Sequence, residues 1–412
     1  MINNIKEGLS FIEKAHNKGK NQDNLNSILK KHGNFHKKVK SIHITGTNGK
    51  GSTSKMLSDI LIKANYKVGL FTSPFIVVVN DRIRVNNNNI SDQQLLELLK
   101  YFYQDIVDYN LNFFQIFVLL ALKYFYDEKV DIAVIEVGIG GRLDATNVID
   151  SILSIITNIN YDHTDKLGSS LEAIAFEKAG IIKQNSPVIT GVSQDNLLKT
   201  IKAKSAILNS DLIVVEKSDS KVVDELLQVT YNNKVYTVNT QAKYQGDNAR
   251  LTLAAVNVLC NNYGFKILDK DIRQALANFA WVGRYEEVSK NPRVILDGAH
   301  NLAGIKALIE SSKDNNNTVV IFSALPDKSY KEMLELLQDN FTEVVFSNFN
   351  FYKSLSPKQL SELKVEKFKS FREAYNYLTT KYPDYDILVC GSLYFVSEVR
   401  KEFIKESNQK KQ

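Results

Sequence analysis

The order of apolar and polar positions divides most of the chain into short apolar runs separated by longer stretches of helical spacing. The apolar runs predict strands at 42–44, 67–71, 130–136, 152–157 and near residue 187. Helical spacing predicts helices at 5–32, 52–64, 91–108, 112–126 and 170–179. Strands that alternate with helices in this way indicate a mostly parallel sheet covered by helices on both faces.

The pattern changes between about residues 210 and 240, where apolar and polar residues alternate one by one. This alternation predicts antiparallel strands, and Asn232-Asn233 supplies residues suited to a hairpin turn. Helices are expected to follow at 245–263 and 269–279. We therefore expect a small antiparallel appendage in the same domain as the parallel sheet.

A second series of strands and helices begins at residue 293. It predicts strands at 293–297, 318–323, 342–347 and 386–390, and helices at 301–312, 328–338, within 356–379 and at the C-terminal end. The preceding residues, Ser289-Lys290-Asn291-Pro292, are typical of a linker. The sequence thus predicts an α/β protein with three parts: an N-terminal P-loop ATPase domain at 1–287, a hinge at 288–292 and a smaller Rossmann-like domain at 293–412.

A glycine-rich loop follows the first strand and leads directly into a helix, an arrangement that binds phosphate. The loop comprises Gly46, Thr47, Asn48, Gly49, Lys50, Gly51 and Ser52. Glycines let backbone N–H groups approach an anion, the helix start adds partial positive charge, and Lys50 adds a full charge. Gly51 occupies the position where phosphate loops usually carry a hydroxyl residue. We interpret the loop as a nucleoside triphosphate site rather than a plain turn, with Ser52 or a more distant group helping to bind Mg²⁺.

Polar residues follow three of the predicted strands. Ser73 comes after 67–71, Glu136 closes 130–136, and His163 follows 152–157. Ligands of parallel sheets bind beyond the carboxyl ends of the strands, where all three residues are expected to lie. A hydroxyl, a carboxylate and an imidazole beside a phosphate loop predict a Mg²⁺ site, although a single histidine is more often structural.

Two further segments allow both a structural and a functional interpretation. Lys178 lies near the end of a predicted helix, where a lysine can simply neutralise the helix dipole. Asp297, His300 and Asn301 follow a strand of the second domain and open a helix. Asp297 or Asn301 could be a helix N-cap, or the segment could be a second face of one active site.

Composition narrows the class of protein. Of 412 residues, 52 are basic and 46 acidic, so the net charge is +6, and no basic patch interleaved with aromatic residues favours nucleic-acid binding. Cys260 and Cys390 lie in apolar contexts without a CxxC pair, which is typical of a reducing compartment. The longest apolar stretch, 113–122, is too short to cross a bilayer. We expect a cytoplasmic monomer that binds small molecules and neither nucleic acid nor membrane.

Taken together, the motifs resemble those of the folylpolyglutamate synthase and dihydrofolate synthase family within the Mur ligase superfamily. The matching segments are GTNGKGS at 46–52, TSP at 72–74, EVGIGGRLDATN at 136–147, DH at 162–163, EKAGIIK at 177–183, GRYE at 283–286, DGAHN at 297–301, DK at 327–328 and GSLY at 391–394. They span nearly the whole chain, and the GGRLDATN segment favours the folate branch over the peptidoglycan ligases.

The resemblance implies a role for each of these segments. ATP phosphates would bind Lys50 and its loop, and Mg²⁺ would bind Ser73, Glu136 and His163, with Lys178 carried as a carbamate. The nucleotide site would be completed by Asn248, Arg284, Asp297 and His300. The loop 73–82 would border the folate, and the C-terminal domain would hold L-glutamate.

The implied activity is ATP-dependent formation of an amide between L-glutamate and a folate, either tetrahydrofolate or dihydropteroate, through an acyl phosphate. Three positions depart from the family pattern: Phe75 replaces a histidine, and Val282 and Leu302 replace prolines. Phe75 is the departure that bears on the pterin substrate. Two other hypotheses stay open: a Mur-type ligase that acts on another acid, and a nucleotide-dependent switch or nucleic-acid binder that uses the same loop.

Overall fold

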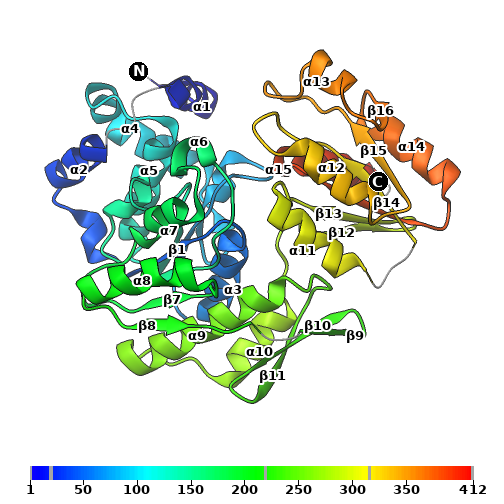
Figure 1. Ribbon diagram of the computed structural model, residues 1–412. Helices are drawn as coiled ribbons and strands as arrows, with labels where there is room; N and C mark the ends of the chain where they lie inside the picture. Colours follow the sequence, from blue (N-terminus) through cyan, green and yellow to red (C-terminus); the bar gives the residue numbers. More distant parts are fainter. Residues whose placement is uncertain (1, 18–21, 218–219, 314–316, 410–412) are drawn as a thin grey trace. The chain divides into compact units, whose positions relative to one another are not determined.

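The computed structural model describes residues 2–17, 22–217, 220–313 and 317–409 (Figure 1). Its residues form two compact units. The first contains Met1–Asp219, Val229–Thr237 and Asp247–Phe279, and the second contains Ser220–Gln228, Val238–Gly246 and Ala280–Gln412. Within the described ranges, every helix is too short or too polar to span a bilayer.

The first unit is built on an eight-stranded sheet with the order β4-β3-β2-β5-β1-β6-β7-β8. Its strands are β1 Ser41–Thr45, β2 Val68–Phe71, β3 Ile83–Val85, β4 Asn88–Asn89, β5 Ile132–Glu136, β6 Leu153–Ile156, β7 Val188–Thr190 and β8 Leu212–Val214. Neighbouring strands from β2 to β8 in this order are parallel, whereas β3 and β4 add antiparallel pairs at one edge. The prediction of a mostly parallel sheet is confirmed.

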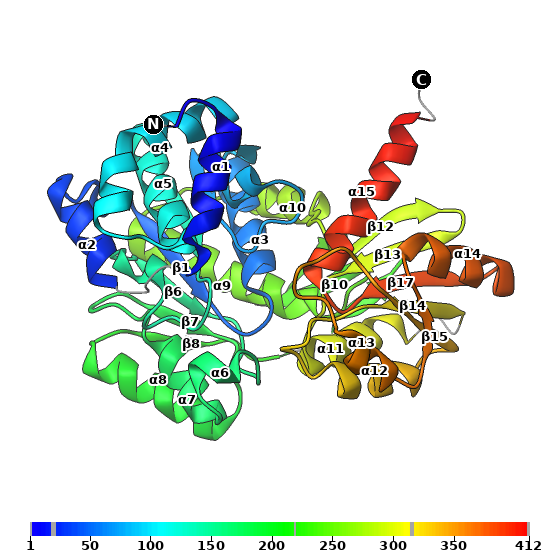
Figure 2. The ribbon, with the colours of Figure 1, turned by 90° about the horizontal axis from the view of Figure 1, so that it is seen from above.

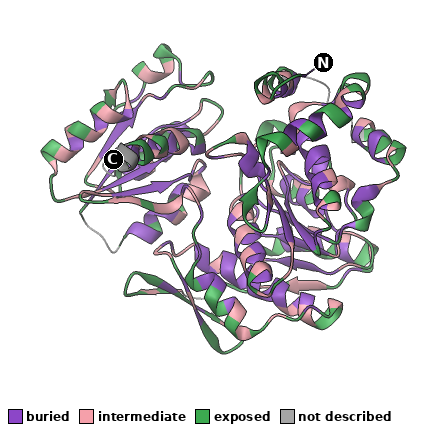
Figure 3. Cartoon of the chain, turned by 180° about the vertical axis from the view of Figure 1, so that it is seen from behind, coloured by how far each residue is buried: buried purple, intermediate pink, exposed green. Residues whose placement is uncertain are grey.

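Helices cover this sheet because its central strands are apolar on both faces. They are α1 Ile5–Glu13, α2 Gln22–Lys31, α3 Lys50–Lys63, α4 Asp92–Asp108, α5 Phe113–Asp127, α6 Thr164–Leu167, α7 Leu171–Ala179, α8 Asp195–Ile207, α9 Gln245–Tyr263 and α10 Asp269–Ala277. Ala133 and Ile135 of β5 pack in one core with α4 and α5. Helix α3 contacts β1, β2 and β5 outside that core. Figure 2 shows α1, α4 and α5 grouped together, and Figure 3 shows the strands buried between helices.

The antiparallel appendage is a separate three-stranded sheet with the order β11-β10-β9. It comprises β9 Lys221–Val223, β10 Leu226–Tyr231 and β11 Lys234–Val238. Asn232 and Asn233 form the predicted turn, with φ angles of 48° and 58° that asparagine tolerates better than most residues. The appendage is shorter than predicted, because residues 212–214 form the last strand of the large sheet and pair in parallel with β7.

The second unit contains a six-stranded sheet with the order β12-β13-β17-β14-β15-β16. Its strands are β12 Arg284–Lys290, β13 Arg293–Asp297, β14 Thr318–Phe322, β15 Glu343–Ser347, β16 Glu366–Phe368 and β17 Asp386–Cys390. Its helices are α11 Leu302–Ser312, α12 Tyr330–Gln338, α13 Pro357–Ser361, α14 Phe371–Lys381 and α15 Leu393–Gln409. Val320 and Phe322 pack on one face with α11 and α12, and Val319 and Ile321 pack on the other with α14 and α15.

The hinge expected at 288–292 lies inside this second sheet. Strand β12 pairs antiparallel with β13, and Lys290 lies opposite Arg293, so Asn291 and Pro292 close a hairpin. Proline and polar residues suit a hairpin turn as well as a linker, which is why the sequence did not distinguish the two. The last boundary between the units falls instead between Phe279 and Ala280, and residues 220–228 and 238–246, predicted in the N-terminal domain, belong to the second unit. Strand β16, which is mostly exposed, lacked the apolar pattern needed to predict it.

Candidate active site

The phosphate loop has the predicted strand, turn and helix. Strand β1 is fully buried at the centre of the sheet and ends at Thr45, and α3 begins at Lys50. Gly49 is the N-cap of α3 with a φ of 84°, so no side chain caps the helix, and its first turn contains no acidic residue. A helix start of this kind, with a lysine in its first turn, is suited to bind an anion.

Two glycines of the loop are required by close packing. A Cβ atom on Gly46 would lie 1.8 Å from Oγ1 of Thr157, and a Cβ atom on Gly49 would lie 2.2 Å from Oδ1 of Asn248. Asn248 is buried on α9, and the hydroxyl of Thr53 on α3 lies 3.5 Å from the same oxygen. Asn248 thus lies directly against the loop.

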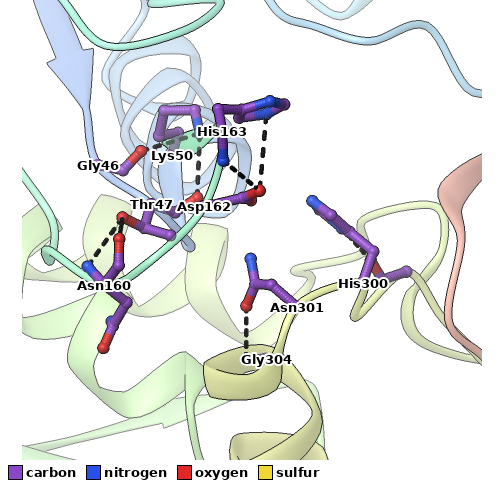
Figure 4. Close-up of polar contacts among 10 residues, drawn as sticks. Gly46, Thr47, Lys50, Asn160, Asp162, His163, His300, Asn301 and Gly304 are labelled. Carbon is purple, nitrogen blue, oxygen red and sulfur yellow. Dashed lines mark hydrogen bonds and ion pairs between the residues drawn. The ribbon is translucent and has the colours of Figure 1, made fainter. Parts of the chain in front are cut away.

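The segment that follows β6 fixes the shape of the loop. Oγ1 of Thr157 and Nδ2 of Asn158 both donate to the carbonyl of Asn48, and Oδ1 of Asn158 accepts from its N–H. The Thr47 hydroxyl donates to the carbonyl of Asn160 and accepts from its N–H, each at 3.0 Å (Figure 4). Sequence analysis assigned these residues no role. The two asparagines at the carboxyl end of a buried strand were the signal that could have found them.

Lys50 folds back over its own loop. Its Nζ donates to the carbonyl oxygens of Gly46 at 3.0 Å and Thr47 at 3.2 Å, as Figure 4 shows. In the same view His163 lies beside Asp162: its backbone N–H donates to Oδ1 of Asp162, and its Nε2 is 3.9 Å from that oxygen. His163 has a φ of 49° immediately before α6, so the chain turns sharply at the residue expected to bind metal.

The structure brings Ser73 and Glu136 together. Glu136 is 4% exposed at the end of β5, and its Oε2 accepts a hydrogen bond from the backbone N–H of Ser73 at 2.9 Å. The loop after Ser73 is held by Asp81, whose Oδ2 accepts from the N–H groups of Ile76 and Val77. A buried carboxylate is costly unless it is matched by donors or a cation, so this end of β5 is a favourable place for positive charge.

Lys178 is in the last turn of α7, as predicted, but it is not a surface lysine that neutralises a helix dipole. It is 3% exposed, and within the described part of the chain its side chain makes no hydrogen bond or ion pair. Burial and then the charge of Lys50 lower the pKa of Lys178 well below its ordinary value, and Asp162 opposes the shift. Burial thus favours the neutral form of this amine more than water does.

Two motifs of the sequence are joined by hydrogen bonds around Lys178. Arg142 forms an ion pair with Glu177, and its backbone N–H donates to the Glu177 carbonyl at 2.7 Å. Nδ2 of Asn147 donates to the carbonyl of Gly180, and Nζ of Lys183 donates to Oδ1 of Asn147. The EKAGIIK helix end is thus held against the GGRLDATN loop.

A series of buried hydrogen bonds connects the same loop to strand β1. Oδ1 of Asp144 accepts from the hydroxyl of Thr146 at 2.5 Å, and that hydroxyl lies 2.8 Å from Nε2 of His43. Oδ2 of Asp144 accepts from the N–H of Ile139. His43 belongs to the strand that carries the phosphate loop, so these hydrogen bonds fix the two loops relative to each other within the first unit.

The described residues suit Mg²⁺ better than a metal whose ligands must all come from protein side chains. Among the described residues, no three side chains of His, Cys, Asp or Glu form a group that could hold a metal on their own. Mg²⁺ is commonly bound by one or two carboxylates, with water and substrate phosphates completing its shell. The buried Glu136 carboxylate beside Ser73 fits that requirement.

The second unit contains the other predicted residues. Asp297 ends β13 with 2% exposure and accepts hydrogen bonds from the hydroxyl of Tyr244 and the N–H groups of Tyr285 and Ala299. Burial raises the pKa of Asp297, and the charge of Arg284, which lies opposite it on β12, works against the shift. No local sequence pattern predicted the contact of Tyr244 with Asp297, which lies 53 positions away.

The residues after Asp297 also have defined positions. Nδ1 of His300 lies 2.8 Å from the carbonyl of Gly298, and Oδ1 of Asn301 accepts from the N–H of Gly304 (Figure 4). Asn301 is therefore the N-cap of α11, one of the two structural roles considered for this segment. Asp297 is bound by other groups and leaves that capping role to Asn301.

Phe75 has a clear packing role in the loop after Ser73. Its ring lies 5.3 Å from the guanidinium carbon of Arg82, which also lies over the rings of Phe113 and Phe117 at 5.3 and 5.4 Å. Arg82 is 6% exposed. Cation–π contacts of a buried guanidinium are favourable, so Phe75 helps to fix the loop expected to border the acceptor.

Two family models match long segments of this chain. The profile of the Mur ligase middle domain matches residues 44–259, and that of the Mur ligase, glutamate ligase domain matches 283–393. The chain resembles the dihydrofolate synthase/folylpolyglutamate synthase of Bacillus subtilis (strain 168), with 35% identity over 401 residues that cover 92% of this chain and 93% of that protein. It is 31% identical to the folylpolyglutamate synthase of Lacticaseibacillus casei over 427 residues, which cover 97% and 99% of the two chains.

Solved structures show the same likeness. The apo form of the L. casei synthase superposes with a TM-score of 0.88 at 29% identity, covering 98% of this chain and 100% of that one. A folylpolyglutamate synthase complex with AMPPCP and folate superposes with a TM-score of 0.87 at 31% identity, with the same coverage.

Replacing Gly46 by alanine should destabilise the first unit. The new Cβ would collide with Thr157, and the φ of 155° disfavours any side chain, so we expect a loss of about 3 kcal/mol in the free energy of unfolding. Gly33→Ala is the matched control: its φ is 76°, but nothing lies within 4 Å, so about 1 kcal/mol should be lost. Urea denaturation followed by circular dichroism measures both variants, and equal losses would contradict the close-packing argument.

Stability should fall in mild acid because two histidines are buried in neutral form. Burial lowers the pKa of His36 from 6.5 to about 4, and it lowers that of His43 well below 6.5. Below pH 6.5 the unfolded chain binds protons that these folded sites reject, so stability decreases as the pH falls from 6.5 towards 4. His36→Asn should make this decrease shallower in urea titrations at several pH values, and an unchanged slope in that variant would contradict the role of His36.

Proposed function

Because the chain belongs to the folylpolyglutamate synthase and dihydrofolate synthase family of Mur ligases, we propose that it joins L-glutamate to a folate acceptor at the expense of ATP. The acceptor is a reduced folate such as tetrahydrofolate, and dihydropteroate in addition if the enzyme is bifunctional. Relatives with both activities in their names, and a related synthase bound to AMPPCP and folate, support this assignment.

The observation that carries the proposal is the concentration of unusual polar groups at the carboxyl ends of β1, β5 and β6. The phosphate loop, whose helix has no side-chain cap, follows β1, and the buried carboxylate of Glu136 ends β5. The buried amine of Lys178, which has no partner among the described residues, is close enough to Lys50 and Asp162 for their charges to act on it. A structural role explains one such group, but all three are explained by a bound nucleotide and metal.

In the proposed mechanism the acceptor carboxylate attacks the γ-phosphate of ATP, which releases ADP and leaves an acyl phosphate. The amine of L-glutamate then attacks the acyl carbon, the amide forms, and phosphate leaves. Lys50 and the N–H groups at the start of α3 neutralise the charge of the transferring phosphoryl group. His300 and Asp297, with Arg284 and Asn248, would bind the nucleotide, and the C-terminal unit would hold the glutamate.

Mg²⁺ would be held by Ser73, Glu136 and His163, together with Lys178 once that lysine is modified. When bound, the ion supplies positive charge that polarises the phosphate oxygens. The chain's own contribution is the fixed geometry of these side chains: Glu136 is held by the Ser73 N–H, and His163 is placed by the turn at its own backbone.

Lys178 is proposed to carry a carbamate. Its neutral amine can add to carbon dioxide with loss of a proton, which converts a buried amine into an anionic carbamate beside Lys50. If so, ¹³C-labelled bicarbonate should give a carbamate NMR signal that is absent from Lys178→Ala and retained in Lys166→Ala, a change at an exposed lysine. Lys178→Ala should also lose at least about 100-fold in turnover. A wild-type protein without the signal but with full activity would refute the carbamate.

The competing enzyme function is a Mur-type ligase that acts on a different carboxylic acid. The nucleotide-dependent switch or nucleic-acid binder is a weaker alternative, because it gives Glu136, His163 and the 297–301 segment no role. It predicts ATP hydrolysis that glutamate does not affect and salt-sensitive binding of DNA or RNA.

The deciding experiment measures ADP release with ATP, Mg²⁺ and L-glutamate, and compares dihydropteroate with tetrahydrofolate. Activity with both acceptors indicates a bifunctional enzyme, and activity with tetrahydrofolate alone indicates a dedicated polyglutamylating enzyme. Activity with neither, but with another acid, would favour the competing ligase and direct attention to Phe75. Lys50→Ala should abolish the glutamate-dependent release, whereas Lys63→Ala, at the exposed far end of α3, should retain it.

A further inference from the structure

Tyr244 contacts Asp297 although neither the motifs nor the proposed mechanism gives it a role. It lies directly before α9, and its hydroxyl donates to Oδ2 of Asp297 at 2.5 Å. Both residues belong to the second unit. Among the described residues, Tyr244 is the one side chain that donates a hydrogen bond to this carboxylate.

The other two donors to Asp297 are backbone groups. The N–H of Ala299 donates to Oδ1 at 2.8 Å and that of Tyr285 to Oδ2 at 2.9 Å. Tyr285 has a φ of 54° at a register shift between β12 and β13, and this irregularity directs its N–H towards the carboxylate. Burial raises the pKa of Asp297, and these hydrogen bonds oppose that shift by stabilising the ionised carboxylate; Tyr244 supplies the shortest of them.

The segment that carries Tyr244 is fixed independently. The backbone N–H of Lys243 donates to Oγ of Ser311 at 3.0 Å, which places the chain beside α11. Tyr244 also precedes Asn248, the residue packed against Gly49 in the first unit, by only four positions. One short stretch of sequence thus supplies a polar group to Asp297 and another to the phosphate loop.

We propose that Tyr244 is a positioning residue of the nucleotide site, which holds Asp297 in the orientation and charge state in which it accepts hydrogen bonds from the nucleotide. This inference rests on the proposed nucleotide-binding role of Asp297. Tyr244 itself acts through Asp297 and takes no part in bond making. Its hydroxyl matters because a buried carboxylate that loses a donor becomes harder to ionise.

The test compares Tyr244→Phe with Tyr285→Phe. The second variant removes a neighbouring hydroxyl that lies 3.5 Å from Ser312 and keeps the backbone N–H that Asp297 needs, so it is a matched control. Tyr244→Phe should raise the KM for ATP and the dissociation constant for ADP by roughly tenfold, with little change in the KM for glutamate. Tyr285→Phe should leave all three constants close to those of the wild type.

The pH dependence of ADP binding distinguishes loss of the Tyr244 hydrogen bond from a loss of packing, because packing alone would not change that pH dependence. The titratable or charged groups that face Asp297 are Tyr244, Arg284, Tyr285 and Cys390. Since the Tyr244 hydrogen bond lowers the pKa of Asp297, its loss should move the acid limb of ADP affinity to higher pH. In an Asp297→Asn background, Tyr244→Phe should have no further effect on ADP affinity.

Calorimetric titration with ADP measures nucleotide binding without the ligase reaction, so it tests the role of Tyr244 independently of the proposed function. Equal ADP affinities and pH profiles for Tyr244→Phe and Tyr285→Phe would overturn the role of Tyr244, even if glutamate-dependent ADP release is normal. The same role would be overturned by additive effects of Tyr244→Phe and Asp297→Asn. A wild-type protein that binds ADP, shows the Tyr244 effect and forms no amide would instead contradict the proposed reaction alone.

Discussion

The first unit depends on one constraint: parallel strands end at the same edge of their sheet. Strands β5, β1 and β6 are adjacent, so the loops that follow them converge, although β1 ends at Thr45 and the other two strands end at Glu136 and Ile156. Hydrogen bonds then fix each loop to another, with residues 157–160 holding Asn48 and the Thr45 hydroxyl donating to the carbonyl of Gly140. The glycines of the phosphate loop follow from this constraint, since backbone segments this close leave no room for a Cβ atom.

Burial of charge is the second recurring feature. Glu136, Asp144, Lys178 and Asp297 are each less than 9% exposed, and a buried charge is costly without compensation. Asp144 and Asp297 are compensated by hydrogen bonds from within their own units. Glu136 has the Ser73 N–H, and Lys178 has no partner at all among the described residues. Of these four groups, Lys178 is the one without a compensating partner among the described residues, and it is the group for which a covalent modification is proposed.

Sequence reasoning recovered the features that depend on local patterns. The buried strands, the phosphate loop at the start of α3 and the turn at Asn232-Asn233 are all present, because apolar periodicity and turn chemistry act over a few residues. It failed where long-range pairing decides the structure. Asn291-Pro292 closes a hairpin because β12 pairs with β13, and residues 212–214 join the large sheet because β7 offers an edge.

The candidate site likewise combines residues that local patterns indicate with contacts that only the fold reveals. Ser73, Glu136 and Lys50 could be named from their positions after strands, whereas their partners required the fold. The hydrogen bond between Tyr244 and Asp297 joins residues 53 positions apart, and nothing in either local sequence indicates the other. The burial of Lys178 was also hidden, since a lysine in the last turn of a helix is usually exposed.

The discontinuous composition of the second unit limits how the protein can be divided or recombined. Residues 220–228 and 238–246 belong to that unit, although they precede 247–279 of the first. A gene fragment that begins at residue 280 would therefore encode Asp297 without Tyr244, leaving its carboxylate only the two backbone donors. Exchange of residues 280–412 for those of a relative would separate Tyr244 from the Asp297 that it contacts. A single crossover between Phe279 and Ala280 would thus divide a hydrogen-bonded pair of the second unit between two parents.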